Sequence, residues 1–388
     1  FPGQGMYNGI TVSQRRWRNA ALALLCCFGA AVSQLVNAQQ AELAAAVPVG
    51  SVNLVVAQSS SEQERLDVGL VIFNPGIPLD ASTHSMLGIF PEIRKAEAQF
   101  MPVLLRQVLV TSDAWGVVRV LPDHQASSEL LVTGKILQSN GTRLVILFTV
   151  RDATGRVWVD KAYADIATER DYPGVEGSDP FIDLYHQFAN DLLAFRQRLD
   201  QSQLRSIRQV AQMRYAASLS EEAFGSYLAE DAQGNYTVLR LPADGDPMMA
   251  RVERIRNQEH LFVDTVDEQY VNLYEEMAPT YNLWRQYSLE QAMYLEDFEV
   301  RAQNRDRIGQ RGSFTAMEQT YNTYKQIKIQ EQDLDDMALG FNTEVAPTAM
   351  EASGKVFRLT GTLDTQYNEW RSILREIFAI ETGLPPGA

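Results

Sequence analysis

Apolar residues follow two different patterns along the chain, one in each half. Between residues 66 and 166, short apolar runs are bounded by Gly, Pro, Asn or Asp, which is typical of β-strands. After residue 201, apolar residues recur at intervals of three and four, which is typical of amphipathic α-helices. The strands are expected at residues 52–56, 66–73, 117–121, 130–139, 142–150 and 157–166.

Two helices are expected among these strands. Residues 92–112 place apolar side chains at helical spacing, with Arg94, Lys95 and Glu97 on the opposite face. Pro102 lies within this stretch and should kink the helix, because proline removes one backbone donor. The second helix follows Asp179 and Pro180, which are an N-cap residue and a proline suited to the first helical position.

The dipeptide Asn140-Gly141 lies between two of the expected strands. Asn-Gly favours the positive φ angles of a type I′ turn, so we expect a two-residue β-hairpin at this point. The order of strands and helices predicts an α/β domain over residues 50–200, with a small mixed or antiparallel sheet and helices on one face. The fold class expected for the whole chain is α+β, with this domain first.

The second half, residues 201–388, is predicted to be a mainly helical domain. A short β-hairpin interrupts it near residues 226–241, around a Gln-Gly-Asn turn. Asp246 and Pro247 then mark the start of a helix. The apolar residues between 363 and 377 alternate by three and four, which favours a helical bundle or a coiled-coil-like arrangement.

A five-residue pattern, Tyr-Asn-x-aromatic-base, occurs three times in this half, at residues 281–285, 321–325 and 367–371. Positions three apart share a helix face, so the tyrosine and the second aromatic residue project together. One interpretation is a buried seam with the basic residue in solvent, and the other is an exposed aromatic stripe that binds a partner or a glycan. The candidate partner-binding residues are Tyr281, Trp284, Arg285, Tyr321, Tyr324, Tyr367, Trp370 and Arg371.

The first 38 residues read as a signal peptide. Three arginines precede an uncharged apolar run over residues 20–36, and the small residue Ala38 supplies a cleavage site. We therefore expect a periplasmic or secreted protein, cleaved near Ala38. Two alternatives stay open: the run is retained as a membrane anchor, or the chain is lipidated at Cys26 or Cys27, its two cysteines.

Charge excludes one class of partner. The chain has 34 Lys and Arg against 49 Asp and Glu, a net charge of −15. Nucleic acids bind through clusters of basic residues, and no such cluster follows the leader, so we expect no nucleic-acid partner. Strong binding to anionic membranes is disfavoured for the same reason.

Catalytic and metal motifs do not emerge from the sequence. The four histidines, at positions 84, 124, 186 and 260, are scattered and show no metal-ligand spacing. Nucleophile-elbow, phosphate-loop and zinc-protease motifs are absent from the sequence. We expect no cofactor, although many carboxylate pairs, such as Glu221-Glu222, leave acid–base chemistry open.

The first domain resembles a known type. Its residues 66–73, 117–122, 130–136 and 150–158, the last with the sequence Val-Arg-Asp-Ala-Thr-Gly-Arg-Val-Trp, follow a strand pattern that is similar to the α/β domain of the TolB amino-terminal region, the activator LpoB and the secretion protein CsgG. This resemblance implies a bacterial cell-envelope protein that works by binding other proteins.

The expected function is therefore that of an exported, non-catalytic accessory or scaffold protein that binds other cell-envelope proteins. Self-association into a homo-oligomer is left open. Two alternatives remain: a carbohydrate- or peptidoglycan-active enzyme that uses an Asp/Glu pair, and a binder of glycans or small ligands that uses exposed Tyr and Trp rings.

Overall fold

A computed structural model describes residues 46–57, 64–84, 89–123, 128–172, 179–308 and 347–384. Contacts divide the chain into residues 1–47 and residues 48–388, each a compact unit. The architecture below is that of the second unit. The predicted leader and the motif copy at residues 321–325 lie outside the described residues.

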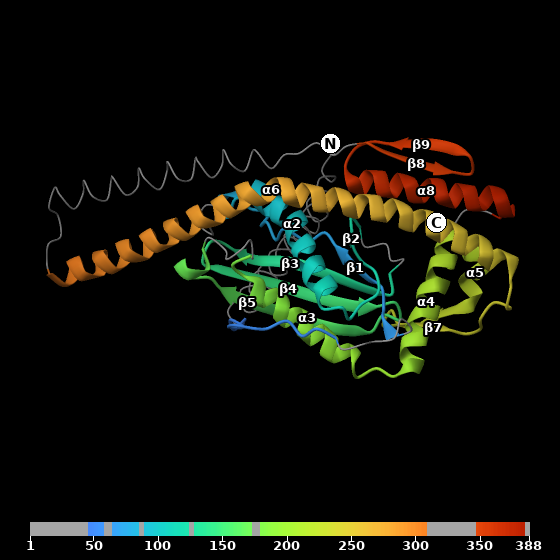
Figure 1. Cartoon of the computed structure of the whole chain (residues 1–388), viewed down its shortest axis with the longest axis horizontal. Coiled ribbons are helices and arrows are strands. Elements are labelled where there is room, and N and C mark those ends of the chain that lie inside the picture. Colours follow the sequence, from blue (N-terminus) through green and yellow to red (C-terminus); the bar gives the residue numbers. More distant parts are fainter. Residues whose placement is uncertain are drawn as a thin grey trace, which may run out of the picture. The chain divides into compact units, whose positions relative to one another are not determined.

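A five-stranded mixed sheet forms the centre of this unit (Figure 1). The strand order is β2-β1-β3-β4-β5; β1 pairs in parallel with β2 and β3, and β3, β4 and β5 form an antiparallel meander. The mixed sheet and the α+β class agree with the sequence prediction. The strands are β1 (Val68–Val71), β2 (Val118–Leu121), β3 (Leu130–Ser139), β4 (Arg143–Asp152) and β5 (Val157–Ile166).

Two helices, α2 (Pro91–Thr111) and α3 (Ile182–Arg196), pack on one face of the sheet. Alternate residues of the strands point toward them, as the period of two in a strand requires. Phe148 of β4, for example, contacts Phe188 of α3 at a ring-centroid distance of 4.2 Å. Both helices were predicted, and α2 continues through Pro102. The expected polar face of α2 is wrong for Arg94 and Glu97, which are buried. Helix α3 begins at Ile182 and not at Pro180, with Phe181 and not Asp179 at the N-cap position.

The second half is mainly helical, as predicted. In the ranges that the structure describes, its helices are α4 (Gln201–Leu219), α5 (Glu221–Phe224), α6 (Pro247–Ile308) and α8 (Leu363–Thr382). The expected hairpin is present as β6 (Leu228–Glu230) and β7 (Tyr236–Val238). A second hairpin, β8 (Thr348–Ala352) and β9 (Lys355–Leu359), was not predicted.

Helix α6 covers the outer edge of strand β2. The carboxylate of Asp267 accepts a hydrogen bond from Val120 N at 2.8 Å and pairs with Arg106 of α2 at 2.7 Å. One turn earlier, Asp264 accepts from Arg119 Nε at 2.5 Å. Since an uncovered strand edge offers unpaired backbone groups, the acidic side chains of α6 close this edge of the sheet.

Helix α6 also takes part in both hydrophobic cores. Its residues 277–284 join α2, α3 and the sheet in the first core. Its residues 249–270 join α4, α8 and the β8–β9 hairpin in the second core. The predicted boundary near residue 201 coincides with the start of α4, and the contacts place both sides of it in one unit.

The β3–β4 loop differs from the expected type I′ turn. It has three residues, 140–142, and neither Asn140 nor Gly141 has a positive φ. Instead, the Asn140 side chain accepts hydrogen bonds from the backbone N–H of Thr142 and Arg143 at 3.0 and 2.8 Å. A Cβ on Gly141 would lie 2.1 Å from Leu289 N of α6, so this glycine allows a helix to approach the loop.

Candidate functional site

The two described copies of the Tyr-Asn-x-Trp-Arg pattern lie on α6 and α8. Both tyrosines and both tryptophans are buried, with 0–2 % exposure, and Arg285 and Arg371 are also buried, at 1 % and 7 %. The expectation of a basic residue in solvent is therefore wrong for both copies. The exposed rings that the glycan-binding alternative requires are absent at Tyr281, Trp284, Tyr367 and Trp370.

The first copy meets a buried carboxylate, Glu97 of α2. Tyr281 donates its hydroxyl to Glu97 Oε1 at 3.0 Å and accepts from Arg285 Nε at 2.6 Å. Arg285 Nη2 lies 3.6 Å from the same carboxylate, and Arg94 Nε lies 3.3 Å from its other oxygen. We call these four residues the Glu97 cluster. They combine two cations, one carboxylate and one phenol away from solvent.

The proton on Tyr281 is fixed by its surroundings. Burial raises the pKa of this phenol well above its ordinary value, because the phenolate would have to be formed away from water. The hydroxyl therefore stays protonated and can donate to Glu97 while it accepts from Arg285. A hydrogen bond with an ionised partner is about twice as strong as one between neutral groups.

The same part of α6 also binds the β3–β4 loop. Arg285 Nη1 donates to Asn140 O at 3.0 Å, and Gly141 N donates to Ser288 Oγ at 3.0 Å. From the loop before α3, the Tyr172 hydroxyl donates to Gly141 O at 2.8 Å. These bonds satisfy backbone groups of the turn that would otherwise be buried without partners.

The second copy repeats this chemistry between α8 and α6. Tyr367 donates its hydroxyl to Glu259 Oε1 at 2.8 Å, and Arg371 Nε lies 3.5 Å from the same oxygen. Glu259 is 1 % exposed, and Trp370 Nε1 donates to Gln258 O at 3.4 Å. We call Glu259, Tyr367 and Arg371 the Glu259 cluster. In both copies, the motif joins one helix to a buried glutamate of another.

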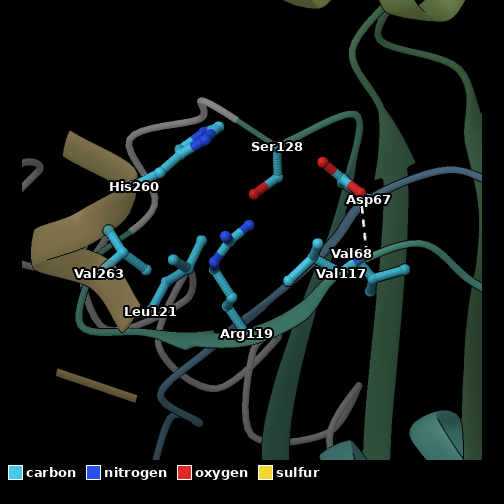
Figure 2. A pocket seen from close by; sticks show the side chains of 8 residues that line it. All are labelled: Asp67, Val68, Val117, Arg119, Leu121, Ser128, His260 and Val263. Carbon is cyan, nitrogen blue, oxygen red and sulfur yellow. Dashed lines mark hydrogen bonds between the residues drawn. The ribbon is translucent and has the colours of Figure 1, made fainter. Parts of the chain in front are cut away.

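A small cavity lies between β2 and α6 (Figure 2). It is lined by Asp67, Val68, Val117, Arg119, Leu121, Ser128, His260 and Val263, and its volume is about 10 Å³. A cavity needs roughly 10–15 Å³ to hold a single water molecule, so this one has no space for an organic substrate.

The polar residues of this cavity bring serine, histidine and aspartate together, which the sequence had not suggested. Burial, together with the charges of Arg256 and Arg119, lowers the pKa of His260 to about 4, so its imidazole is neutral at pH 7. Within the described residues, no hydrogen bond links Ser128 to His260 or His260 to Asp67; Asp67 accepts from Val117 N instead. The nucleophile–base–carboxylate chain of a hydrolase is not formed here.

Two larger hollows occur elsewhere. One, of about 490 Å³, lies between α4 and the β6–β7 hairpin and includes Arg214, Glu221, Glu230 and Tyr236. The other, of about 330 Å³, lies over β3 and β4 and includes Thr133, Lys135 and Thr149. In the described ranges, no group of three or more His, Cys, Asp or Glu side chains is placed to hold a metal ion.

Residues 52–57 form an extended segment along α3, which we call the strap. The sequence predicts a strand at 52–56, but the strap pairs with side chains of α3 and not with a neighbouring strand. Asp183 Oδ1 accepts from Val52 N at 2.9 Å, and Asn190 Oδ1 accepts from Val55 N at 2.8 Å. The end of the strap bonds to α2 through Ala57 N and Ser112 O, 2.8 Å apart.

A second carboxylate, Asp165 of β5, lies close to Asp183 of α3. Burial, and then the negative charges of Asp183 and Asp171, raise the pKa of Asp165 to about 7, against a donated hydrogen bond from Ile166 N that lowers it. Asp165 is 5 % exposed. A buried carboxylate with a raised pKa suits acid–base chemistry, but Asp165 lines none of the cavities described above.

Asp165 should make the stability of the protein depend on pH. Its pKa is about 7 in the folded chain against 3.8 as the ordinary value, so the stabilisation from its protonated form is present at low pH and is lost as the pH rises toward 7. At about 1.4 kcal/mol per pKa unit, the loss is at most about 4 kcal/mol. Asp165→Asn should flatten this decrease, measured by urea unfolding at pH 5 and pH 8.

The control for this measurement is Asp160→Asn, which changes an exposed carboxylate on the same strand. It should keep the pH dependence of the unchanged protein. Parallel pH profiles for Asp165→Asn and the unchanged protein would show that Asp165 is already ionised at pH 5 in the folded chain.

The chain matches no protein-family model, no curated protein and no solved structure. The resemblance to the envelope α/β domain therefore stays a prediction. None of the helices in the described ranges combines the length and the apolar character that a membrane-crossing helix needs.

Proposed function

We propose that this chain is an exported accessory protein of the bacterial cell envelope, which binds other proteins and holds them on a rigid scaffold. The signal-peptide pattern of residues 1–38 supports export. The resemblance of residues 66–166 to envelope α/β domains supports protein binding as the activity. One structural observation carries the scaffold part of the proposal: the way in which α6 is fixed.

Helix α6 is held to the α/β part at two separate places. Asp264 and Asp267 bind strand β2, and the Glu97 cluster binds α2 and the β3–β4 loop five turns further along. Two such attachments define the direction of a helix, because rotation about either one would break the other. The helix then continues from Arg285 to Ile308, which adds roughly 35 Å at 1.5 Å per residue.

This continuation supports a presenting role. In Figure 1 the last part of α6, drawn in orange, runs past the end of the sheet. Where this continuation begins, Leu283 and Tyr287, four residues apart on one helix face, are 46 % and 37 % exposed. We infer that residues 201–388 act as a helical bundle or coiled-coil-like arm, and that this face of α6 meets a partner chain.

Site-specific photo-cross-linking in the envelope of the native bacterium tests this proposal. A cross-linking amino acid at position 283 or 287 should give discrete, reproducible products with another protein or with a second copy of the chain. Position 380 is the matched control, because Ile380 is 81 % exposed on α8, away from the α6 face. The proposal is lost if positions 283 and 287 give no products beyond those of position 380.

Export is tested separately with a reporter. Residues 1–45 fused to an alkaline phosphatase that is active only outside the cytosol should give activity in a Gram-negative host. A fusion that lacks residues 20–36 is the control and should give none. A full-length fusion that stays unprocessed and inactive would contradict the periplasmic assignment.

A further inference from the structure

Three side chains on the outer face of α3 form a row that contacts the strap. Asp183, His186 and Asn190 are separated by three and four residues, so they lie along one face of the helix. Within the described chain, all three bind backbone atoms of residues 52–55. We call these three residues the α3 ladder.

The α3 ladder binds the main chain of the strap. Asn190 Nδ2 donates to Asn53 O at 2.9 Å, and Asn190 Oδ1 accepts from Val55 N at 2.8 Å. Asp183 Oδ1 accepts from Val52 N at 2.9 Å, and His186 Nδ1 donates to Val52 O at 2.9 Å. Every residue except proline has both a backbone N–H and a backbone C=O. The α3 ladder can therefore bind any extended segment that has no proline at the positions of Val52 and Val55.

The strap contributes little buried surface of its own. Val55 and Val56 are 50 % and 54 % exposed, whereas Leu54 and Ala57 are half-buried against the first core. Segments with few buried apolar contacts and solvent-exposed hydrogen bonds open at low free-energy cost. The exposed backbone hydrogen bonds of the strap are therefore accessible to a competing segment.

We propose that the α3 ladder is a binding site for an extended polypeptide segment of a partner protein, and that residues 52–55 occupy it in the unbound protein. The partner segment would pair its backbone with Asp183, His186 and Asn190 and place one apolar side chain where Leu54 packs. This proposal rests on the proposed function only for the source of the segment, a partner protein of the envelope. The peptide experiment below does not depend on the proposed function.

Competition with the strap sets the expected affinity. A segment attached to the same chain has an effective concentration in the millimolar range, so a free peptide has to compete against its own covalent counterpart. A peptide with the sequence of residues 50–57 should therefore bind the unchanged protein weakly. Releasing the strap should increase the apparent affinity of this peptide at least tenfold.

The double variant Val52→Pro/Val55→Pro weakens the attachment of the strap without changing α3, because it removes two of the four hydrogen bonds to the α3 ladder. Each proline removes one N–H that the α3 ladder accepts, while its φ angle still suits an extended chain. The matched control is Val56→Pro, because Val56 N makes no hydrogen bond in the described structure. Binding of the fluorescein-labelled peptide is measured by anisotropy, with far-UV circular dichroism to verify the fold of each variant.

The expected result is binding to the double variant that is at least tenfold tighter than to the unchanged protein and to Val56→Pro. Adding Asn190→Ala to the double variant should reduce the affinity at least fivefold. A folded double variant that binds no better than the unchanged protein would overturn the proposal. Equal peptide binding with and without Asn190→Ala would show that the peptide binds outside the α3 ladder, which would also overturn the proposal.

A second measurement covers the case in which the double variant fails to fold. Several millimolar peptide added to the unchanged protein should speed amide hydrogen exchange at Val52 and Val55 and leave exchange in β3 and β4 unchanged. Unchanged exchange at both amides would contradict the proposal. Dimers of the unchanged protein at micromolar concentration that the double variant abolishes would assign the site to the strap of a second copy and refute the partner segment. Failure of the envelope cross-linking alone would leave these peptide results intact.

Discussion

Replacing Glu97 by alanine is expected to lower the free energy of unfolding by about 3–5 kcal/mol, the usual cost of removing one partner from a buried ion pair. The substitution leaves the cations of Arg94 and Arg285 at 3 % and 1 % exposure without their carboxylate. It also removes the acceptor of the Tyr281 hydroxyl. Native proteins are stable by only about 5–15 kcal/mol, so such a loss is a large part of the total.

Buried Asp179 also attracts Arg285, but among the carboxylates of the described residues only Glu97 acts on Arg94. Arg94 Nη1 has no hydrogen-bond partner even with Glu97 present, and Arg94 Nη2 makes a long bond of 3.3 Å to Ser139 O. Ser139 Oγ itself donates to Glu97 Oε1 at 2.5 Å. Partly satisfied polar networks are costly to disturb in a low dielectric, which places the expected effect of Glu97→Ala at the upper end of its range.

The matched control is Glu92→Ala on the same helix. Glu92 pairs with Lys95 at 2.7 Å, but the two side chains are 39 % and 59 % exposed. Exposed pairs contribute about 0–1 kcal/mol, so this variant should unfold at nearly the same urea concentration as the unchanged protein. If Glu97→Ala and Glu92→Ala shift the midpoint equally, the Glu97 cluster does not attach α6 to α2.

Local signals in the sequence predicted the strands of the central sheet and the start of α6, but not the start of α3, and the strand expected at residues 52–56 is absent. Strand β5 has the predicted bounds of residues 157–166, and α6 begins at Pro247, after Asp246 accepts from Met248 N at 2.8 Å. These signals work because the alternation of apolar residues and the capping side chains act within a few residues. The reason for a glycine at position 141 could not be predicted from the sequence, because it is the close approach of Leu289 of α6 and not the turn itself.

The β8–β9 hairpin shows the limit of the same signals. Its turn residues, Ser353 and Gly354, both have positive φ, at 50° and 73°, as a type I′ turn requires. The strands on either side are five residues long and carry few buried side chains. With so little alternation, the Ser-Gly turn signal alone does not distinguish a hairpin from a break between helices.

Burial of the motif arginines depends on residues far away in the sequence. The spacing of Tyr281 and Trp284 correctly indicated a shared helix face, but it contains no information about Glu97, which lies 184 positions from Tyr281. Tyr367 and Glu259 are 108 positions apart. A basic residue beside a buried seam is placed in solvent by default, because burial of a charge requires a partner that only the fold supplies.

The second large effect is expected for Trp370→Ala in α8, which should cost about 3–5 kcal/mol, as for other buried aromatic residues cut back to alanine. Trp370 is fully buried and packs between Phe262 of α6 and Phe357 of β9, with ring-centroid distances of 6.1 and 6.0 Å. Removal of the indole leaves a cavity and deletes the hydrogen bond to Gln258 O. Ile380→Ala on the same helix is the control; its side chain is 81 % exposed, so its effect should be below about 0.5 kcal/mol.

Hydrogen exchange shows which part of the protein loses stability in Trp370→Ala. The second core joins α8 and the β8–β9 hairpin to the first part of α6, the later part of α4, Val103 of α2, and Val120 and Leu121 of β2. The clustered residues of β3, β4 and α3 belong to the first core. Cooperative units of a protein open separately when few contacts join them, so Trp370→Ala should speed exchange in α8 while β3 and β4 stay protected. The Glu97 cluster lies in the first core and keeps the later part of α6 attached in this variant. Equal loss of protection in α8 and in β4 would instead show that α6 couples the two cores into a single unit.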